Sequence, residues 1–144
     1  METTLNQLVA LGIRQSFNDQ SMLRTLNAKM TCLSLGHVEI EAQITDNFLN
    51  QHNFAHAGVA FTLGDTAGGY AALSQYKAGS NVMTVEFKVN YLAPAIGERL
   101  KAVGRVIRTG KRICVVAADV FVIGIGKEDK IAAMQGTMLP IFKN

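Results

Sequence analysis

The sequence is poor in several features that would directly identify a class of protein. Its two cysteines, Cys32 and Cys114, lie far apart and fit neither a metal-ligand spacing nor a disulfide framework. No run approaches the roughly 20 apolar residues of a membrane-spanning helix. The N-terminus lacks the basic start and apolar core of a signal peptide. We therefore expect two free thiols in a reducing cytoplasm, no metal site and no membrane association.

Charged residues are also scarce, at 17% of the 144 residues, whereas hydrophobic residues reach 49%. Because this composition is apolar for a soluble monomer, we expect a further buried surface between subunits. The net charge of +3 suits a small anionic ligand but is too weak and dispersed to indicate nucleic-acid binding. One modest basic group fits either a solvated hairpin tip or a phosphate site: Arg105, Arg108, Lys111 and Arg112.

The length suits one domain, 1–144, with its own core. Apolar residues at helical spacing predict an amphipathic helix over residues 4–17. A turn at Asn18-Asp19 and a short second helix over 20–26 follow. We treat the segment from about 2 to 26 as a helical N-terminal part of the same domain.

From residue 29 onward most segments alternate between apolar and polar residues, which indicates strands with one wet face. The expected strands cover 30–35, 37–44, 84–91, 100–107, 112–123 and 131–139. Turns are expected at Gly36-His37 and Thr109-Gly110. Polar loops are expected over 46–55 and 124–130.

The stretch from Asn50 to Tyr76 interrupts these strands and holds one formally charged residue, Asp65. We expect a long helix that starts near His56 or Ala57 and ends near Tyr76. Glycine inside a helix costs about 1 kcal/mol relative to alanine, so its many small residues indicate close approach to a surrounding surface. The predicted fold is α+β: one curved antiparallel sheet of five to six strands wrapped around a long central helix.

The residues in this stretch resemble those of a known family. Asn50, the triplet His56-Ala57-Gly58, and Asp65 within TLGDTAGGYAA follow the spacing of hotdog-fold thioesterases of the PaaI-like, phenylacetic-acid-degradation group. The segment VNYLAPA also resembles the central strand of that family, and the resemblance covers roughly residues 30–140. It implies hydrolysis of acyl-coenzyme A thioesters.

The resemblance also implies roles for individual residues. Asp65 would act as general base or nucleophile, Asn50 would place the water, and the backbone amide of Ala57 would polarise the thioester carbonyl. Thr84 would assist, and we give His56 a positioning role. In the family such sites lie between the two subunits of a homodimer, and dimers often pair into tetramers. The family commonly has glycine where this chain has Ala57, but alanine keeps the amide hydrogen and fits a helix start with negative φ.

The chemistry agrees with these implied roles. Thioester hydrolysis needs a base or nucleophile, a donor for the developing oxyanion and a pocket for the acyl chain. The first-turn amides of the central helix are free donors, and Asp65 is the acidic group that the apolar stretch offers. We expect coenzyme A to be held by Gly58 and by the basic residues Arg108, Lys111 and Arg112. It enters as part of the substrate, so no separate cofactor is expected.

Other interpretations remain open on the sequence. Asp65 could face solvent, and Asn50 could be a plain loop residue. A hotdog acyl-thioester dehydratase or hydratase is one alternative, but neither Pro94 nor Pro140 lies near a histidine, as typical signatures of such enzymes require. A non-catalytic acyl-CoA-binding hotdog module is the other alternative.

Overall fold

The computed structural model describes residues 4–142. Its helices and strands follow one another along the chain, with two helices first, then two strands, the long helix and four strands. Their bounds are α1 (Gln7–Asp19), α2 (Ser21–Thr25), β1 (Lys29–Ser34), β2 (His37–Gln43), the short 3-10 helix η1 (Asp46–Phe48), α3 (Ala57–Leu73), β3 (Asn81–Tyr91), β4 (Arg99–Thr109), β5 (Cys114–Gly124) and β6 (Lys127–Ile141).

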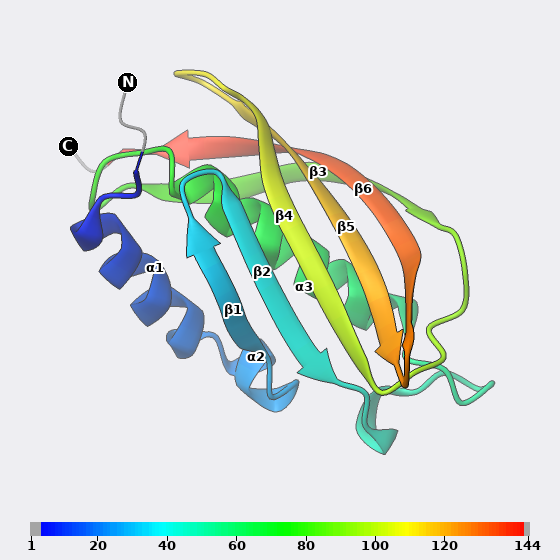
Figure 1. The fold of residues 1–144 in the computed structure, drawn as a ribbon. Helices are drawn as coiled ribbons and strands as arrows, with labels where there is room; N and C mark the ends of the chain where they lie inside the picture. The colour runs from blue at the N-terminus through cyan, green and yellow to red at the C-terminus, as the bar shows by residue number, and fades with distance from the viewer. Residues whose placement is uncertain (1–3, 143–144) are drawn as a thin grey trace.

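The strands form a six-stranded antiparallel sheet in the order β1-β2-β4-β5-β6-β3. Figure 1 shows the sheet curving around α3, which confirms the predicted architecture. β3 follows α3 in the chain but lies at the edge of the sheet, and among the described strands it pairs with β6 alone. This edge strand is 11 residues long and exposes large apolar side chains, including Met83 and Val85.

The contact between α3 and the sheet explains the small residues of this helix. A Cβ atom at Gly104 of β4 would overlap the carbonyl group of Ala67 and the amide of Gly68 on α3, so the two backbones are in contact. A Cβ atom at Gly64 would overlap the sulfur of Met134 on β6. Leu63, Ala67 and other α3 residues are fully buried in the core that results. Small side chains therefore bring the helix onto the sheet, as the sequence predicted.

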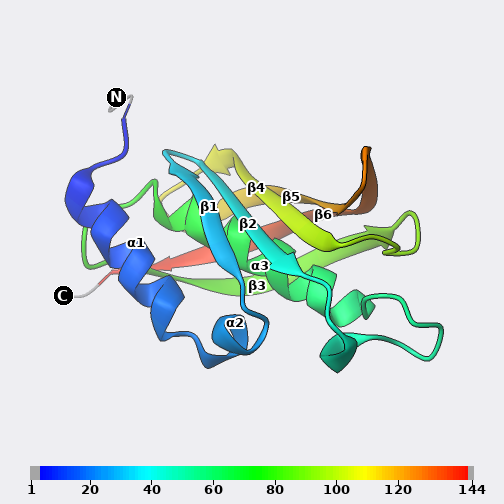
Figure 2. The same cartoon turned by 60° about the horizontal axis from the view of Figure 1, so that its bottom comes forward.

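α1 packs beside β1 and reaches α3 at the side that the sheet leaves uncovered (Figure 2). The Asn6 side chain caps it by accepting hydrogen bonds from the amides of Leu8 and Val9. The Phe17 ring lies 6.2 Å from that of Tyr70, measured between centroids. The N-terminal helices are thus part of the same packed structure as α3.

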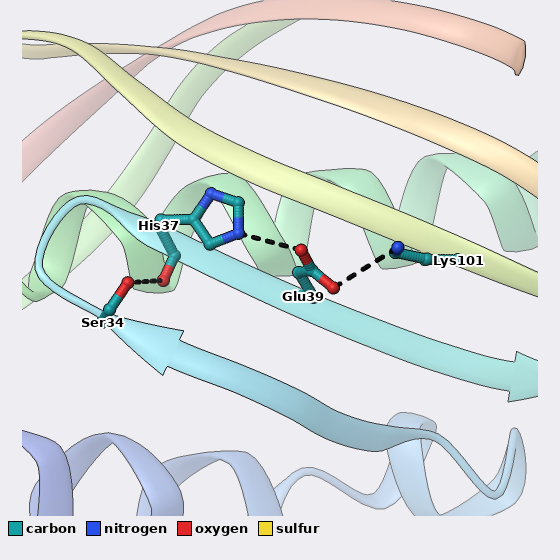
Figure 3. Close-up of polar contacts among 4 residues, drawn as sticks. All are labelled: Ser34, His37, Glu39 and Lys101. Atoms are coloured by element: carbon teal, nitrogen blue, oxygen red, sulfur yellow. Dashed lines mark hydrogen bonds and ion pairs between the residues drawn. The ribbon is translucent and has the colours of Figure 1, made fainter.

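The outer face of the sheet carries ion pairs (Figure 3). The Glu39 carboxylate lies 3.0 Å from the Nε2 atom of His37 and 3.5 Å from the Nζ atom of Lys101. The hydrogen bond with His37, together with the charge of Lys101, lowers the pKa of Glu39 against a smaller opposing effect of burial. These contacts lie away from α3 and belong to the wet face that the alternating pattern of β2 predicted.

Several predicted boundaries were wrong. α3 ends at Leu73 rather than near Tyr76, because the Ser74 hydroxyl donates to the Ala71 carbonyl at 2.6 Å and accepts the Gly36 amide at 2.7 Å. The first hairpin turns one residue earlier than expected, at 35–36. The loop expected over 124–130 is a two-residue turn at 125–126. Gly36 and Gly126 have φ of +73° and +69°, which permits such short connections. α1 covers Gln7–Asp19 and therefore includes the residues expected to form a turn.

Candidate functional site

The central acidic residue makes a direct contact with the edge strand. The Thr84 hydroxyl of β3 donates to the Oδ1 atom of Asp65 at 2.7 Å. Asp65 is half-buried and Thr84 is exposed, so the pair lies at the surface of the chain. No other hydrogen bond or ion pair engages the Asp65 carboxylate within residues 4–142. Its second oxygen is therefore free to accept a proton or to attack.

The start of α3 presents a second polar group. The Nδ1 atom of His56 accepts the amide of Gly58 at 2.8 Å, and its backbone carbonyl accepts that of Val59 at 2.9 Å. In the described part of the chain, the Ala57 amide hydrogen has no hydrogen-bond partner. The hydroxyl of Tyr91 donates to the Ala57 carbonyl at 3.1 Å, and desolvation raises the pKa of that phenol. The helix start therefore offers one free, well-held amide donor in the positive field of the helix dipole.

Alanine at this position is compatible with the backbone. Positive φ values outside glycine occur in residues 4–142 only at Asn27 and Asn53, so Ala57 carries no left-handed strain. His56, just before it, has φ −59° and ψ 138°, an extended conformation that caps the helix. A Cβ atom at Gly58 would lie 3.0 Å from the His56 ring, so glycine leaves room for the cap.

Asn50 shapes the loop that precedes α3. Its Oδ1 atom accepts the amides of His52 and Phe54 at 2.9 and 3.1 Å. Its backbone amide also donates to the Phe54 carbonyl at 2.8 Å. The side-chain oxygen is thus engaged in the turn, which leaves the Nδ2 hydrogens as the polar groups that could meet a ligand. No further role for His52 emerges from these contacts.

The two polar groups do not meet in one chain. Ala57 and Asp65 are eight residues apart on one continuous helix, which corresponds to about 12 Å along its axis at about 1.5 Å per residue. A base and an oxyanion donor that act on the same carbonyl must each lie within about 3 Å of its reacting atoms. One chain therefore brings together Asp65 and Thr84, but does not bring either to Ala57.

The basic residues are even more distant from the helix start. Arg105 pairs with Asp119 at 2.9 Å on the outer face of the sheet. Arg108, Lys111 and Arg112 are exposed at the hairpin between β4 and β5. The Tyr76 hydroxyl donates to the Gly110 carbonyl at 2.9 Å, which places this hairpin beside the C-terminal end of α3. Gly58 lies at the opposite end, so one chain does not assemble these predicted coenzyme A contacts into one site.

Sequence reasoning missed the polar residues around a cavity beside Asp65. This cavity of about 170 Å³ lies between α1, α3 and the start of β3. The Tyr70 ring is buried in the core, and its hydroxyl contacts Ser16 at 2.9 Å and Gln20 at 2.7 Å. Ser16 lies near the end of α1, whereas Gln20 is the extended residue between α1 and α2, so helical spacing in the sequence could not have paired them.

The cysteines are free, as expected, with Cys32 half-buried and Cys114 buried. Burial raises the pKa of the Cys114 thiol, and burial together with this nearby thiol raises the pKa of Tyr76 to about 12. In the described part of the chain, no three His, Cys, Asp or Glu side chains converge as metal ligands. No helix within residues 4–142 is long and apolar enough to span a membrane.

Comparison with known proteins matches this arrangement to one family. The thioesterase superfamily pattern matches residues 52–127. A Halobacterium salinarum protein whose name proposes an esterase is 32% identical over 77% of each chain. The crystal structure of a thioesterase family protein from Silicibacter pomeroyi is 37% identical and has a TM-score of 0.91, covering 94% of this chain and 99% of that one. The PaaI protein of the Escherichia coli phenylacetic acid degradation operon shares the fold, with a TM-score of 0.85 over 97% of this chain and 98% of that one, at 21% identity.

Proposed function

Because the chain belongs to the thioesterase superfamily, we propose that it hydrolyses acyl-coenzyme A thioesters to the free acid and coenzyme A. The observation that carries this proposal is the Asp65 carboxylate, held at 2.7 Å by the Thr84 hydroxyl beside a cavity. A carboxylate that is oriented through one oxygen and unengaged through the other is suited to attack or to proton abstraction.

Two routes use Asp65 in this way. As general base, it takes a proton from water while the oxygen of that water bonds to the thioester carbon. As nucleophile, its own oxygen bonds to that carbon and water later hydrolyses the anhydride. In both routes the carbon–sulfur bond breaks and the coenzyme A thiolate takes up a proton. Thr84 keeps the carboxylate aimed in either case.

The Ala57 amide is the proposed oxyanion donor. It belongs to the first turn of α3, where backbone amides lack partners within the helix, and the helix dipole favours the negative charge that develops on the carbonyl oxygen. The Nδ1 atom of His56 holds the neighbouring Gly58 amide and so fixes the geometry of this turn. We assign Asn50 the placement of the water through its Nδ2 hydrogens.

The separation along α3 supports a site that is shared between two subunits. About 12 Å along the helix axis separates Ala57 from Asp65, so the donor of one chain would serve the carboxylate of the other. The β3 edge supplies a surface for such a homodimer, since it presents an unpaired backbone edge with exposed Met83 and Val85. We further propose that such dimers pair.

The remaining assignments concern coenzyme A and the compartment. Arg108, Lys111 and Arg112 are exposed cations, free of ion pairs within residues 4–142, and we propose that they contact the phosphates of coenzyme A. We propose that Gly58 contacts coenzyme A through its Cα atom and not through its amide, because the amide donates to His56. The two free thiols support residence in the reducing cytoplasm.

The test is hydrolysis of a panel of acyl-CoA thioesters, followed by the release of free thiol. We expect Asp65→Asn to lower kcat by about 10²–10⁴-fold with an unchanged circular dichroism spectrum. Asp19→Asn, on the exposed end of α1, is the matched control. Near-native turnover in folded Asp65→Asn would reject the assignment. Hydration of an enoyl-CoA instead of hydrolysis, or tight binding without turnover, would reject the proposed reaction.

A further inference from the structure

One glycine of α3 has no packing reason to be glycine. Gly69 lies one helical turn after Asp65, and a Cβ atom built on it would meet only the Cε atom of Met138, at an ordinary contact distance of 3.9 Å. Every other glycine of α3 leaves room for a neighbouring side chain: His56 at Gly58, Met134 at Gly64, and Phe87 with Val116 at Gly68.

Gly69 instead borders the cavity beside Asp65. The volume of about 170 Å³ is similar to that of a cavity of about 150 Å³ that holds benzene, a molecule of six carbon atoms. A side chain at position 69 would occupy part of this space. The missing side chain therefore keeps open a cavity that starts at the reactive carboxylate and has room for about six carbons.

The far wall of the cavity is polar. The Gln20 side-chain amide donates to the Tyr70 hydroxyl at 2.7 Å, and that hydroxyl shares a second hydrogen bond with the Ser16 hydroxyl at 2.9 Å. The Oε1 atom of Gln20 has no hydrogen-bond partner within residues 4–142. Since Gln20 also lines the cavity, its Oε1 atom can accept a hydrogen bond from a bound acyl group. A hydroxyl group is the simplest donor that such an acceptor recognises.

A second cavity gives an alternative location for an acyl group. It has a volume of about 500 Å³, lies at the N-terminal end of α3, and is bordered by Thr62 and by apolar residues such as Leu26 and Val59. Asp65 does not border it. His56 and Gly58, next to the proposed oxyanion donor, border this larger cavity. Asp65 and the bare position of Gly69 border the smaller one, so we place the acyl group there and test the larger cavity with its own variant.

We infer that the cavity between α1 and α3 is the acyl pocket, opened by Gly69, and that Gln20 selects short acyl groups of about six carbons that end in a hydroxyl. The inference rests on the proposed thioesterase activity. It assigns substrate selection to Gln20, at the junction of α1 and α2, which lies outside the segment that the superfamily pattern matches.

The size of the pocket is tested by Gly69→Val, with acetyl-CoA and hexanoyl-CoA as substrates. We expect kcat/KM for hexanoyl-CoA to fall by about 10–100-fold and that for acetyl-CoA to change by less than about threefold. Thr62→Leu adds bulk one helical turn before Asp65, at the other cavity, and should leave the ratio of the two values unchanged. A ratio that moves in Thr62→Leu and stays fixed in Gly69→Val would overturn the inference.

The polar wall is tested by Gln20→Leu, with hexanoyl-CoA and 6-hydroxyhexanoyl-CoA. The wild-type chain should prefer the hydroxylated substrate by about fivefold to tenfold in kcat/KM, and the variant should show a ratio near one. Gln15→Leu, whose amide donates to Asp19 on the same helix, should keep the wild-type ratio. A purely structural role for Gln20 would lower stability without changing the ratio, and this result would overturn the inference.

The two levels of the proposal fail differently. Wild-type protein that hydrolyses none of these thioesters overturns the proposed function, and the acyl pocket with it. Wild-type protein that hydrolyses them with unaltered preferences in both the Gly69→Val and Gln20→Leu variants overturns the acyl pocket alone.

Discussion

The shared site leads to a prediction about mixed dimers. Asp65→Asn removes the carboxylate, and Ala57→Pro removes the proposed oxyanion donor. Proline is tolerated in the first turn of a helix. The extended backbone of His56 also suits a residue before proline, and the Ala57 amide has no hydrogen bond to lose in the described chain. Both variants should therefore fold.

The expected magnitude follows from the separation of about 12 Å along α3. Asp65→Asn alone should lower kcat by about 10²–10⁴-fold, and Ala57→Pro alone by about 10²–10³-fold. In a dimer of the two variants, one site combines both defects, whereas the other combines an intact Ala57 with an intact Asp65. Random pairing of equal amounts makes about half of the dimers mixed, so activity should return to about one quarter of the wild-type value.

The assay uses two different affinity tags and co-expression, so that mixed dimers can be isolated and their thiol release measured. Isolated mixed dimers should have about half of the wild-type activity, since one of two sites is intact. Mixed dimers of two Asp65→Asn chains with the same tags serve as the control. If isolated mixed dimers are no more active than the parent variants, the carboxylate and donor belong to one chain and the shared site is wrong.

Two further predictions concern stability. Gly69→Ala should stabilise the chain by about 0.5–1 kcal/mol because its Cβ atom would make only an ordinary contact, at 3.9 Å, with the Cε atom of Met138. Gly68→Ala should destabilise it by about 1–3 kcal/mol because its Cβ atom would lie 2.9 Å from the Phe87 ring. Urea denaturation measures both, and equal effects would contradict the packing argument. The lowered pKa of Glu39 should contribute stability that is present above the unfolded pKa and lost as the pH falls through the folded pKa. The destabilisation by Glu39→Gln should therefore be fully present at pH 7 and shrink as the pH falls through the folded pKa. Glu128→Gln is the control, and a pH-independent effect would exclude this linkage.

The sequence was sufficient to predict the architecture because its strand segments alternate with a period of two, while residues 50–76 form a separate helical stretch of small residues. Alternating strands and one long, small-residue helix have few ways to bury their apolar faces together. The ends of helices and strands were harder to predict from the sequence, since they depend on tertiary contacts. α3 ends where Ser74 accepts the amide of Gly36 from a distant hairpin, and no local pattern reports that bond.

For the candidate site, the sequence led to a hypothesis about particular residues. The isolation of Asp65 pointed to the carboxylate, and its contact with Thr84 fits the role that the family resemblance implied. The cavity was not predictable, because it depends on how α1 packs against α3. Gln20 and Tyr70 are 50 residues apart, and their hydrogen bond appears only in the folded chain.

The contact between Gly104 and the Ala67 carbonyl has a consequence for mutational scanning. Since two backbones touch there, α3 cannot slide or roll on the sheet without separating from it. The orientation of Asp65 therefore depends on the absence of a Cβ atom at Gly104 of β4, which lets α3 lie directly on this strand. A scan for lost activity should find its most sensitive positions partly among residues that touch no substrate and carry no functional group, and these would be misread as catalytic if geometry were ignored.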